Sequence, residues 1–466
     1  MEPLSITIYD LYAFFYSKDE ELLKELKKDL YLEGWIRGNR VSKEVGFIDF
    51  NDGTNFRGIQ LVYDKKELEN FSEVSKLKVG SSIRIVGKFT LTPDAKQPFE
   101  VHLKYLEVVN ECSEDYPLQK KYHTPEFLRE IAHLRPRANL FNALFRVRNT
   151  LTMAIHHFFQ ERNFMYVHTP IITGSDAEGA GEVFNVVTGE KRTNEFFGKD
   201  AILTVSGQLH VEPFAMSFRD VYTFGPTFRA ENSNTPRHAS EFWMIEPEMA
   251  FANLEDDMHL IEDCIKYCIE SVLEHSPLEM EFFNNVVDKS KTLIERLTSI
   301  VESEFKKMTY TEAIEVLTKA VKDGHEFENK DIKWGMDLQT EHERYITENI
   351  IKGPVFIIDY PKDLKAFYMY LNDDHKTVAA CDLLVPYVGE LVGGSQREHR
   401  YDLLKQKMEQ MHLLPELKWY LDLRKYGFTP SAGFGIGFDR LLMYLTGVSN
   451  IRDVQPYPRS ANALKY

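Results

Sequence analysis

The feature that most constrains the fold is a pair of apolar-rich runs on either side of a polar loop, between Thr227 and Glu248. The loop NSNTPRH is rich in Asn, Ser, Thr and Pro, which form turns, so the two runs are expected to pair as an antiparallel hairpin. Arg229 and Glu231 are two positions apart and would point to one face of an extended chain. The alternative interpretation is an ordinary hairpin with a salt-bridged polar face.

This predicted hairpin carries side chains that suit a nucleotide. The guanidinium of Arg229 can bind a phosphate through charge-assisted hydrogen bonds. The ring of Phe242, on the returning run, can lie flat against a purine, and His238 adds a basic group in the loop. The sequence therefore predicts a nucleotide site on one face of the hairpin.

A second motif lies near the C-terminus, in the segment AGFGIGFDRLLMYLTG. Glycines at 433, 435 and 437 remove side chains from one face of a strand, so a flat ligand is expected to approach the backbone there. Arg440 follows in the first turn of an apolar helical pattern. The alternative is a Gly-rich strand in a crowded sheet, whereas the G-x-G-x-x-G spacing of a dinucleotide fingerprint is absent.

Together these segments resemble two motifs of the class II aminoacyl-tRNA synthetases. Motif 2 is F-R-x-E followed by a loop and an E-F pair, and motif 3 is G-x-G-x-G-x-x-R. The amphipathic helix expected at residues 140–161, with residues 162–173, resembles motif 1. The resemblance implies an α+β catalytic domain, an antiparallel sheet flanked by helices. It also implies catalytic roles for Arg229 and Arg440 in an ATP site that comprises Arg229, Glu231, His238, Phe242, Glu390 and Arg440.

The chain of 466 residues is long enough for two or three domains. From residue 29 to about 110, five short apolar-rich runs alternate with turns, and a short helix is expected around residues 65–71, which is the order of an OB-fold. We therefore predict a five-stranded OB-fold β-barrel in residues 1–110, including an N-terminal extension at 1–28. Residues 111–139 contain three prolines and mixed charge, typical of a hinge linker, and residues 140–466 form the catalytic domain, with a helical insertion at about 289–329.

An OB-fold barrel binds single-stranded nucleic acid by stacking bases on aromatic side chains within a basic groove. Phe47 and Arg37 are the candidates for such a face, although each suits the barrel core or a plain surface equally well. In the resembling family this barrel binds the tRNA anticodon. The net charge of −16 argues against a non-specific nucleic-acid binder and still allows a local basic surface.

Several segments, among them LTVSGQLHVE (203–212) and GELVGGSQREHRYDLL (389–404), resemble the asparaginyl-tRNA synthetases. The related aspartyl family has a lysine where this chain has Val211 and shares the arginine at Arg397. One guanidinium undercompensates a buried carboxylate, whereas a carboxamide needs only one donor and one acceptor. We therefore predict L-asparagine as the amino acid, bound by Ser206, Gln208, Glu246, Arg397 and, from an expected lid at 178–181, Glu178. Ser206, Gln208 and Glu212 are expected to lie on one strand.

The resemblance implies that asparagine and ATP form asparaginyl-adenylate and pyrophosphate, and that the 3′ end of tRNA(Asn) then accepts the amino acid with release of AMP. Such chemistry needs positioning and charge stabilisation, and no protein nucleophile. Mg²⁺ prefers oxygen ligands and substrate phosphates, so Asp382 and Glu390 are its candidate ligands. The resemblance of the first helix also implies a homodimer.

Three alternatives differ from this interpretation. An aspartyl-tRNA synthetase is expected to carry lysine at Val211, and a free-standing asparagine-forming paralogue is expected to lack residues 29–110. A non-enzymatic RNA-binding or regulatory relative is expected to have lost Arg229, Glu231, Glu390 or Arg440, all of which are present. Because neither a signal peptide nor a membrane-length apolar stretch is visible, we expect a cytoplasmic enzyme without membrane contact.

Overall fold

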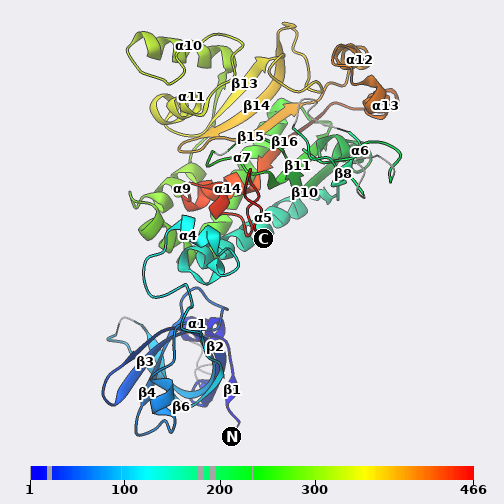
Figure 1. Ribbon diagram of the computed structural model, residues 1–466. Helices are drawn as coiled ribbons and strands as arrows, with labels where there is room; N and C mark the ends of the chain where they lie inside the picture. Colours follow the sequence, from blue (N-terminus) through cyan, green and yellow to red (C-terminus); the bar gives the residue numbers. More distant parts are fainter. Residues whose placement is uncertain (1, 18–23, 96, 176–181, 189–195, 234) are drawn as a thin grey trace. The chain divides into compact units, whose positions relative to one another are not determined.

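The computed structural model describes residues 2–17, 24–95, 97–175, 182–188, 196–233 and 235–466 (Figure 1). The chain divides into two compact units, Met1–Asn142 and Ala143–Tyr466, called the N-terminal and C-terminal units below. Each unit has its own hydrophobic core.

Five strands of the N-terminal unit close into a barrel. Their order is β2-β3-β4-β6-β5, and β5 pairs back onto β2, so that the sheet closes on itself. Side chains alternate between inside and outside, with Ile48 and Phe50 buried and Phe47 on the outer face. The elements of this unit are β1 (Leu4–Ser5), α1 (Ile8–Ser17), β2 (Asp29–Val41), β3 (Val45–Asn51), β4 (Ile59–Asp64), α3 (Phe71–Val74), β5 (Ser82–Leu91), β6 (Phe99–Asn110), α4 (Pro125–Glu130) and a 3-10 turn (Arg135–Arg137).

The closed barrel confirms the predicted OB-fold, with two differences in detail. The short helix between the third and fourth barrel strands begins at Phe71 rather than near residue 65. Asp64 accounts for the later start of the helix. Its carboxylate accepts a hydrogen bond from the Lys66 amide at 2.7 Å, which holds the chain after Asp64 in a turn. The N-terminal extension contains α1, whose buried Ile8 and Leu11 join the barrel core.

The C-terminal unit is built on an eight-stranded sheet, in the order β12-β13-β14-β15-β16-β11-β10-β7. All neighbouring strands are antiparallel except the two edge pairs, β12–β13 and β10–β7. Helices α10 and α11 lie beside β13 and β14, and α7 and α14 lie beside β16 (Figure 1). This antiparallel sheet flanked by helices confirms the predicted α+β class.

The bounds of its strands are β7 (Met165–Tyr166), β10 (Asp220–Phe228), β11 (Glu241–Ala250), β12 (Lys306–Thr309), β13 (Val355–Pro361), β14 (Thr377–Val385), β15 (Gly389–Gln396) and β16 (Ser431–Gly437), with a separate pair β8 (Ile172–Thr173) and β9 (Ile202–Leu203). The helices are α5 (Asn139–Glu161), α6 (Gln208–Phe218), α7 (Leu254–His275), α8 (Pro277–Phe282), α9 (Leu293–Glu302), α10 (Tyr310–Lys322), α11 (Thr340–Tyr345), α12 (Tyr401–Gln410), α13 (Leu414–Asp422) and α14 (Phe438–Thr446). Two π-helical turns (Phe283–Val287, Ile346–Ile351) and two 3-10 turns (Leu423–Lys425, Ile451–Asp453) complete this unit. Among the described residues, no helix is both long and apolar enough to cross a lipid bilayer.

The two sequence motifs meet at the centre of this sheet. The predicted hairpin is confirmed as β10–β11, with Thr227 opposite Phe242. The glycine-rich strand β16 pairs with β11 on its other side, so that Gly437 lies opposite Met244. Arg440, in the first turn of α14, is thereby brought towards the loop end of the hairpin, where it lines one cleft with Arg237 and His238.

Two expectations from the sequence were wrong in detail. Gln208 and Glu212 lie on helix α6, not on a strand, although the run from Ser206 to Glu212 alternates polar and apolar residues. The segment expected as a helical insertion at about 289–329 contains helices α9 and α10 but also β12, which pairs in parallel with β13 at the edge of the main sheet. A four-residue strand carries too little periodic signal to be distinguished from a loop.

Candidate active site

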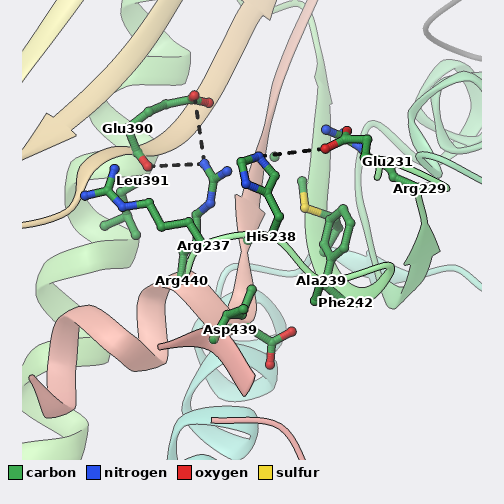
Figure 2. A pocket seen from close by; sticks show the side chains of 14 residues that line it. Arg229, Glu231, Arg237, His238, Ala239, Phe242, Glu390, Leu391, Asp439 and Arg440 are labelled. Atoms are coloured by element: carbon green, nitrogen blue, oxygen red, sulfur yellow. Dashed lines mark hydrogen bonds and ion pairs between the residues drawn. The ribbon is translucent and has the colours of Figure 1, made fainter. Parts of the chain in front are cut away.

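A cleft lies between the β10–β11 hairpin, β16 and the start of α14 (Figure 2). All six predicted ATP-binding residues line it, together with residues that were not assigned from the sequence. The lining residues are Arg229, Glu231, Arg237, His238, Ala239, Phe242, Met244, Glu390, Leu391, Gly435, Gly437, Asp439, Arg440 and Ile451.

Arg229 and Phe242 form one corner of the cleft. The sequence had suggested that Arg229 and Glu231 lie on a strand. Strand β10 ends at Phe228, however, so both residues lie in the loop just beyond it. The Arg229 amide donates to the Ser240 carbonyl at 3.0 Å, which keeps this part of the loop paired. The guanidinium carbon of Arg229 is 5.4 Å from the centroid of the Phe242 ring, so a cation and an aromatic face share one wall.

His238 and Glu231 face each other across the loop, with His238 Nε2 3.7 Å from a carboxylate oxygen of Glu231 (Figure 2). Thr235 Oγ1 is hydrogen-bonded to the other ring nitrogen, Nδ1. Burial lowers the pKa of His238, an effect only partly opposed by Glu231. At neutral pH the imidazole is therefore mainly an uncharged hydrogen-bonding group.

Arg440 closes the opposite side of the cleft. Its Nη1 lies 3.9 Å from a carboxylate oxygen of Glu390 and 3.5 Å from the Glu390 carbonyl. Gly435 and Gly437 both line the cleft, as expected from their missing side chains. Gly433 does not: a Cβ there would collide with the Pro247 carbonyl and lie 2.9 Å from Arg397 Nη2. The first glycine therefore makes room for packed protein atoms, which corrects the expectation that all three open a face to the ligand.

Asp382 and Glu390 converge on the bare backbone of Gly393. A carboxylate oxygen of each lies 3.4 to 3.5 Å from the position that a Cβ of Gly393 would take. Lys365 Nζ is 2.6 Å from the other oxygen of Asp382. No cluster of three or more His, Cys, Asp or Glu side chains suited to a metal ion occurs in the described ranges. Two carboxylates fit Mg²⁺, which commonly takes its remaining ligands from substrate phosphates and water.

Beside the cleft, Glu246 is buried at the N-terminal end of α6. The Ser206 hydroxyl donates to one of its oxygens, and the Gly207 amide donates to the other at 2.9 Å. Burial raises the pKa of Glu246, although these two hydrogen bonds and the charges of Arg229 and Arg397 oppose the shift. Ser206 and Glu246, 40 residues apart in the sequence and both predicted to bind the amino acid, are thus in contact with each other.

Arg397 is engaged by protein partners to an extent that the sequence did not predict. Its Nε and Nη2 donate to Glu248, at 3.1 and 2.7 Å, and its Nη1 donates to Ser395 Oγ at 2.7 Å. Arg397 is only 3% exposed and Glu248 is fully buried. The expected role of Arg397 as a donor to the substrate is therefore restricted to its remaining N–H groups. Nothing in the sequence of strand β11 indicated that Glu248, rather than the ligand, would be the main partner of Arg397.

Val211, Gln208 and Glu178 are the remaining positions considered for the amino-acid site. Val211 packs with Val167, Ala215 and Val221 in a small core cluster, so the position of the aspartyl family's lysine is apolar and closed. Gln208 is buried at the start of α6. Glu178 and the expected lid at 178–181 lie outside the described residues.

On the barrel, the two candidate RNA contacts differ in their surroundings. Phe47 is on the outer face of β3, opposite Arg40 of β2. Arg37 instead donates to Asn139 at 3.1 Å and is half-buried against the end of the predicted linker. Gln60 and Glu100, which were not singled out from the sequence, share the outer face of neighbouring strands and are joined by a 3.0 Å hydrogen bond. Their alternation with buried residues along each strand is the signal that could have found them.

Comparison with known proteins agrees with this geometry. A family model described as class II tRNA synthetases (D, K and N) matches residues 124–461, and one described as an OB-fold nucleic acid binding domain matches residues 30–109. The asparagine–tRNA ligase of Desulfitobacterium hafniense is 59% identical over 448 residues, which cover 93% of this chain and 95% of that protein. The chain belongs to the asparaginyl-tRNA synthetases.

Solved structures of asparaginyl-tRNA synthetases have the same architecture. The enzyme of Pyrococcus horikoshii, complexed with asparaginyl-adenylate, aligns with a TM-score of 0.84 at 32% identity, over 95% of this chain and 98% of that one. The Entamoeba histolytica enzyme, also complexed with asparaginyl-adenylate, aligns with a TM-score of 0.81 at 26% identity, over 94% and 97%. The predicted resemblance is thus confirmed, and with it the assignment to the ATP-dependent ligases.

Proposed function

We propose that this chain activates L-asparagine with ATP and transfers the asparaginyl group to the 3′ end of tRNA(Asn) for translation in the cytoplasm. The observation that carries the proposal is the convergence of Arg229, Phe242, Glu390 and Arg440 on one cleft, from elements up to two hundred residues apart in the sequence. Asparagine–tRNA ligases at 57–59% identity support the choice of amino acid.

Each side of the cleft suits a different part of ATP. Phe242 offers its ring to the adenine, and Arg229 lies where one guanidinium can contact both the α-phosphate and the amino-acid carboxylate. His238 and Arg440 stand on the side expected for the outer phosphates. Glu231 is close enough to His238 to orient it and also to accept from the adenine amino group.

The chemical step is attack of an asparagine carboxylate oxygen on the α-phosphorus, with pyrophosphate as the leaving group. Arg229 stabilises the charge that develops on the α-phosphate, and Arg440 stabilises the departing pyrophosphate. Asp382 and Glu390 would hold Mg²⁺, which neutralises phosphate charge when bound. The 3′-terminal ribose hydroxyl then attacks the acyl carbon, and AMP leaves.

Selection of asparagine rests on the polar groups beside Glu246. A carboxamide supplies one acceptor and one NH₂ donor, whereas a side-chain carboxylate brings a second negative charge next to Glu246 and Glu248. Arg397 already shares its charge with Glu248, and Val211 provides no second cation. Such unpaired buried charge opposes aspartate more strongly than any difference in shape does.

The direct test combines purified protein, ATP, Mg²⁺ and labelled asparagine with a tRNA(Asn) transcript. We expect asparaginyl-adenylate in acid-quenched mixtures without tRNA, and acid-precipitable asparaginyl-tRNA when the transcript is added. Absence of both products, with folded protein, would refute the proposal.

The outer face of the barrel is the proposed anticodon site, because Phe47 offers a ring for base stacking and Gln60 and Glu100 offer hydrogen-bonding groups beside it. Loss of one stacked base costs about 1–3 kcal/mol. We therefore expect Phe47→Ala to raise the KM for tRNA(Asn) about five- to hundredfold while leaving ATP–pyrophosphate exchange unchanged. Aminoacylation kinetics measure the first quantity, and an unchanged KM for tRNA would contradict this placement.

We also propose a homodimer formed through the C-terminal unit. Large apolar side chains are exposed near the β7 edge, including Met165, Phe218 and Phe251. Arg219 lies over the ring of Phe251, and Phe214 stacks with Phe218, so part of this surface is contiguous. Exposed apolar groups of this kind are typical of a protein interface.

Sedimentation equilibrium is expected to give twice the monomer mass at micromolar concentration. Phe251→Asp, which places a charge within this surface, is expected to shift the mass towards the monomer, whereas Tyr122→Asp, at an exposed site in the N-terminal unit, is expected to leave it unchanged. A concentration-independent monomer for the unaltered protein would contradict the dimer.

A further inference from the structure

A buried carboxylate on α6 connects the predicted amino-acid site to the C-terminal helices. Glu212 is fully buried and accepts a hydrogen bond from Gln208 Nε2 at 2.8 Å. The Tyr420 hydroxyl donates to the same oxygen at 2.5 Å, and Arg424 Nη2 lies 2.6 Å from the other oxygen. Glu212 thus joins one turn of α6 to two residues that follow more than two hundred positions later.

The partners of Glu212 are themselves held in place. Arg424 Nε donates to the Glu398 carbonyl at 3.0 Å, and its Nη2 donates to the Tyr420 hydroxyl at 3.0 Å. The guanidinium carbon is also 4.0 Å from the ring centroid of Phe428. Because these groups are buried and mutually bonded, the Glu212 carboxylate has little freedom to turn.

This arrangement determines which way the Gln208 amide faces. An ionised carboxylate only accepts hydrogen bonds, so the NH₂ of Gln208 must point towards Glu212. The Gln208 carbonyl oxygen Oε1 then points the other way, where it is buried and has no hydrogen-bond partner in the described part of the chain. A buried acceptor without a donor is unfavourable, so this oxygen is expected to meet a donor on a ligand.

We propose that Glu212 is a positioning residue that locks the Gln208 amide so that its carbonyl oxygen accepts a hydrogen bond from the α-ammonium of the bound amino acid. The ion pair with Arg424 keeps the carboxylate in the required orientation. The inference rests on the proposed function, in which Gln208 contacts asparagine.

The ammonium is favoured over the substrate's carboxamide as the donor because of the local charge. Glu212 lies directly behind the Gln208 amide and polarises it, which makes its oxygen a stronger acceptor for a cation. Glu246 is joined to Ser206 and Gly207, immediately before Gln208, and adds a second carboxylate to the same turn. Two neighbouring carboxylates suit a positively charged group better than a neutral amide.

The test is Glu212→Gln, which keeps the size of the side chain and gives it an NH₂ donor. That donor can face Gln208 Oε1, so the Gln208 amide is free to turn over and present its NH₂ to the ammonium. We expect the KM for asparagine in ATP–pyrophosphate exchange to rise about tenfold or more, with kcat changed much less. The inhibition constant of succinamate, which is asparagine without its ammonium group, is expected to stay within about twofold.

Two further variants distinguish a role in orienting the Gln208 amide from a purely structural role. Tyr420→Phe removes another donor from the same carboxylate oxygen but leaves the Gln208–Glu212 bond, so its ratio of asparagine KM to succinamate inhibition constant is expected to match that of the unaltered protein. Gln208→Met keeps Glu212 paired with Arg424 and is expected to change that ratio as Glu212→Gln does. It replaces Glu212→Gln as the test if that variant proves unstable on heating.

The outcomes distinguish this inference from the proposed function. Asparagine-dependent exchange by the unaltered protein, with an unchanged ratio in both Glu212→Gln and Gln208→Met, would overturn the positioning role alone. An equal weakening of asparagine binding and succinamate binding in Glu212→Gln would also overturn it, because the loss of a purely structural residue affects both ligands. No asparagine-dependent exchange by the unaltered protein would overturn the proposed function itself.

Discussion

Replacement of Arg440 by alanine is expected to slow asparaginyl-adenylate formation about 10²- to 10³-fold, the usual cost of removing one group that stabilises developing charge. Arg440 lies in the cleft, and its only near carboxylate, among the residues described, is Glu390 at 3.9 Å. Its side chain is 33% exposed, so the substitution is expected to leave the melting temperature within a few degrees of the original. Single-turnover formation of labelled adenylate measures the chemical effect.

Arg344→Ala is the matched control for this experiment. Arg344 is a partly exposed arginine that pairs with Glu348 on the neighbouring turn and does not line the cleft. We expect it to form adenylate at the original rate. Near-normal adenylate formation by Arg440→Ala would show that the glycine-rich strand and α14 do not build the ATP site.

Replacement of Arg397 by methionine is expected to lower the free energy of unfolding by about 3–5 kcal/mol, because it leaves the Glu248 carboxylate buried without its partner. The two side chains are 3% and 0% exposed and share a two-bond contact, at 3.1 and 2.7 Å. Urea unfolding followed by a probe in the C-terminal unit measures the change. A loss below about 1 kcal/mol would mean that the pair is not formed as described.

The double variant Arg397→Met with Glu248→Met is the control for the buried charge. Replacing both partners by apolar groups of similar size is often nearly neutral for stability. The double variant is therefore expected to recover most of the stability lost in Arg397→Met, while asparagine-dependent exchange remains impaired. If the double variant is less stable than the single one, the cost comes from packing around Gly433 rather than from charge.

The elements that the sequence predicted well are those with a strong local signal. The β10–β11 hairpin follows from two apolar runs around a turn-forming loop, and the barrel follows from five such runs at regular spacing. The position of Arg440 follows from the glycine-rich run that leads directly into α14. For the hairpin and for Arg440, the chemistry and the geometry are specified within about twenty residues.

The features that were wrong or missed depend on contacts between distant segments. Gln208 and Glu212 alternate with apolar residues as on a strand, yet the helix brings them within 2.8 Å of each other on one face, where Arg424 completes the cluster. The partner of Arg397 is 149 residues away, and nothing near either residue indicates that Glu248 would be buried with it. Neither propensity nor spacing reports which charges a fold brings together in its interior.

Amino-acid-dependent ATP–pyrophosphate exchange tests the central claim most directly, with asparagine, aspartate and lysine compared in the presence and absence of Mg²⁺. We predict exchange with asparagine, little with aspartate because Val211 stands where the aspartyl family has its lysine, and none with lysine. Removal of Mg²⁺ is expected to abolish the signal. Exchange with aspartate as efficient as with asparagine would contradict the proposed selectivity, and no exchange with any of the three would contradict the assignment as an amino-acid-activating enzyme.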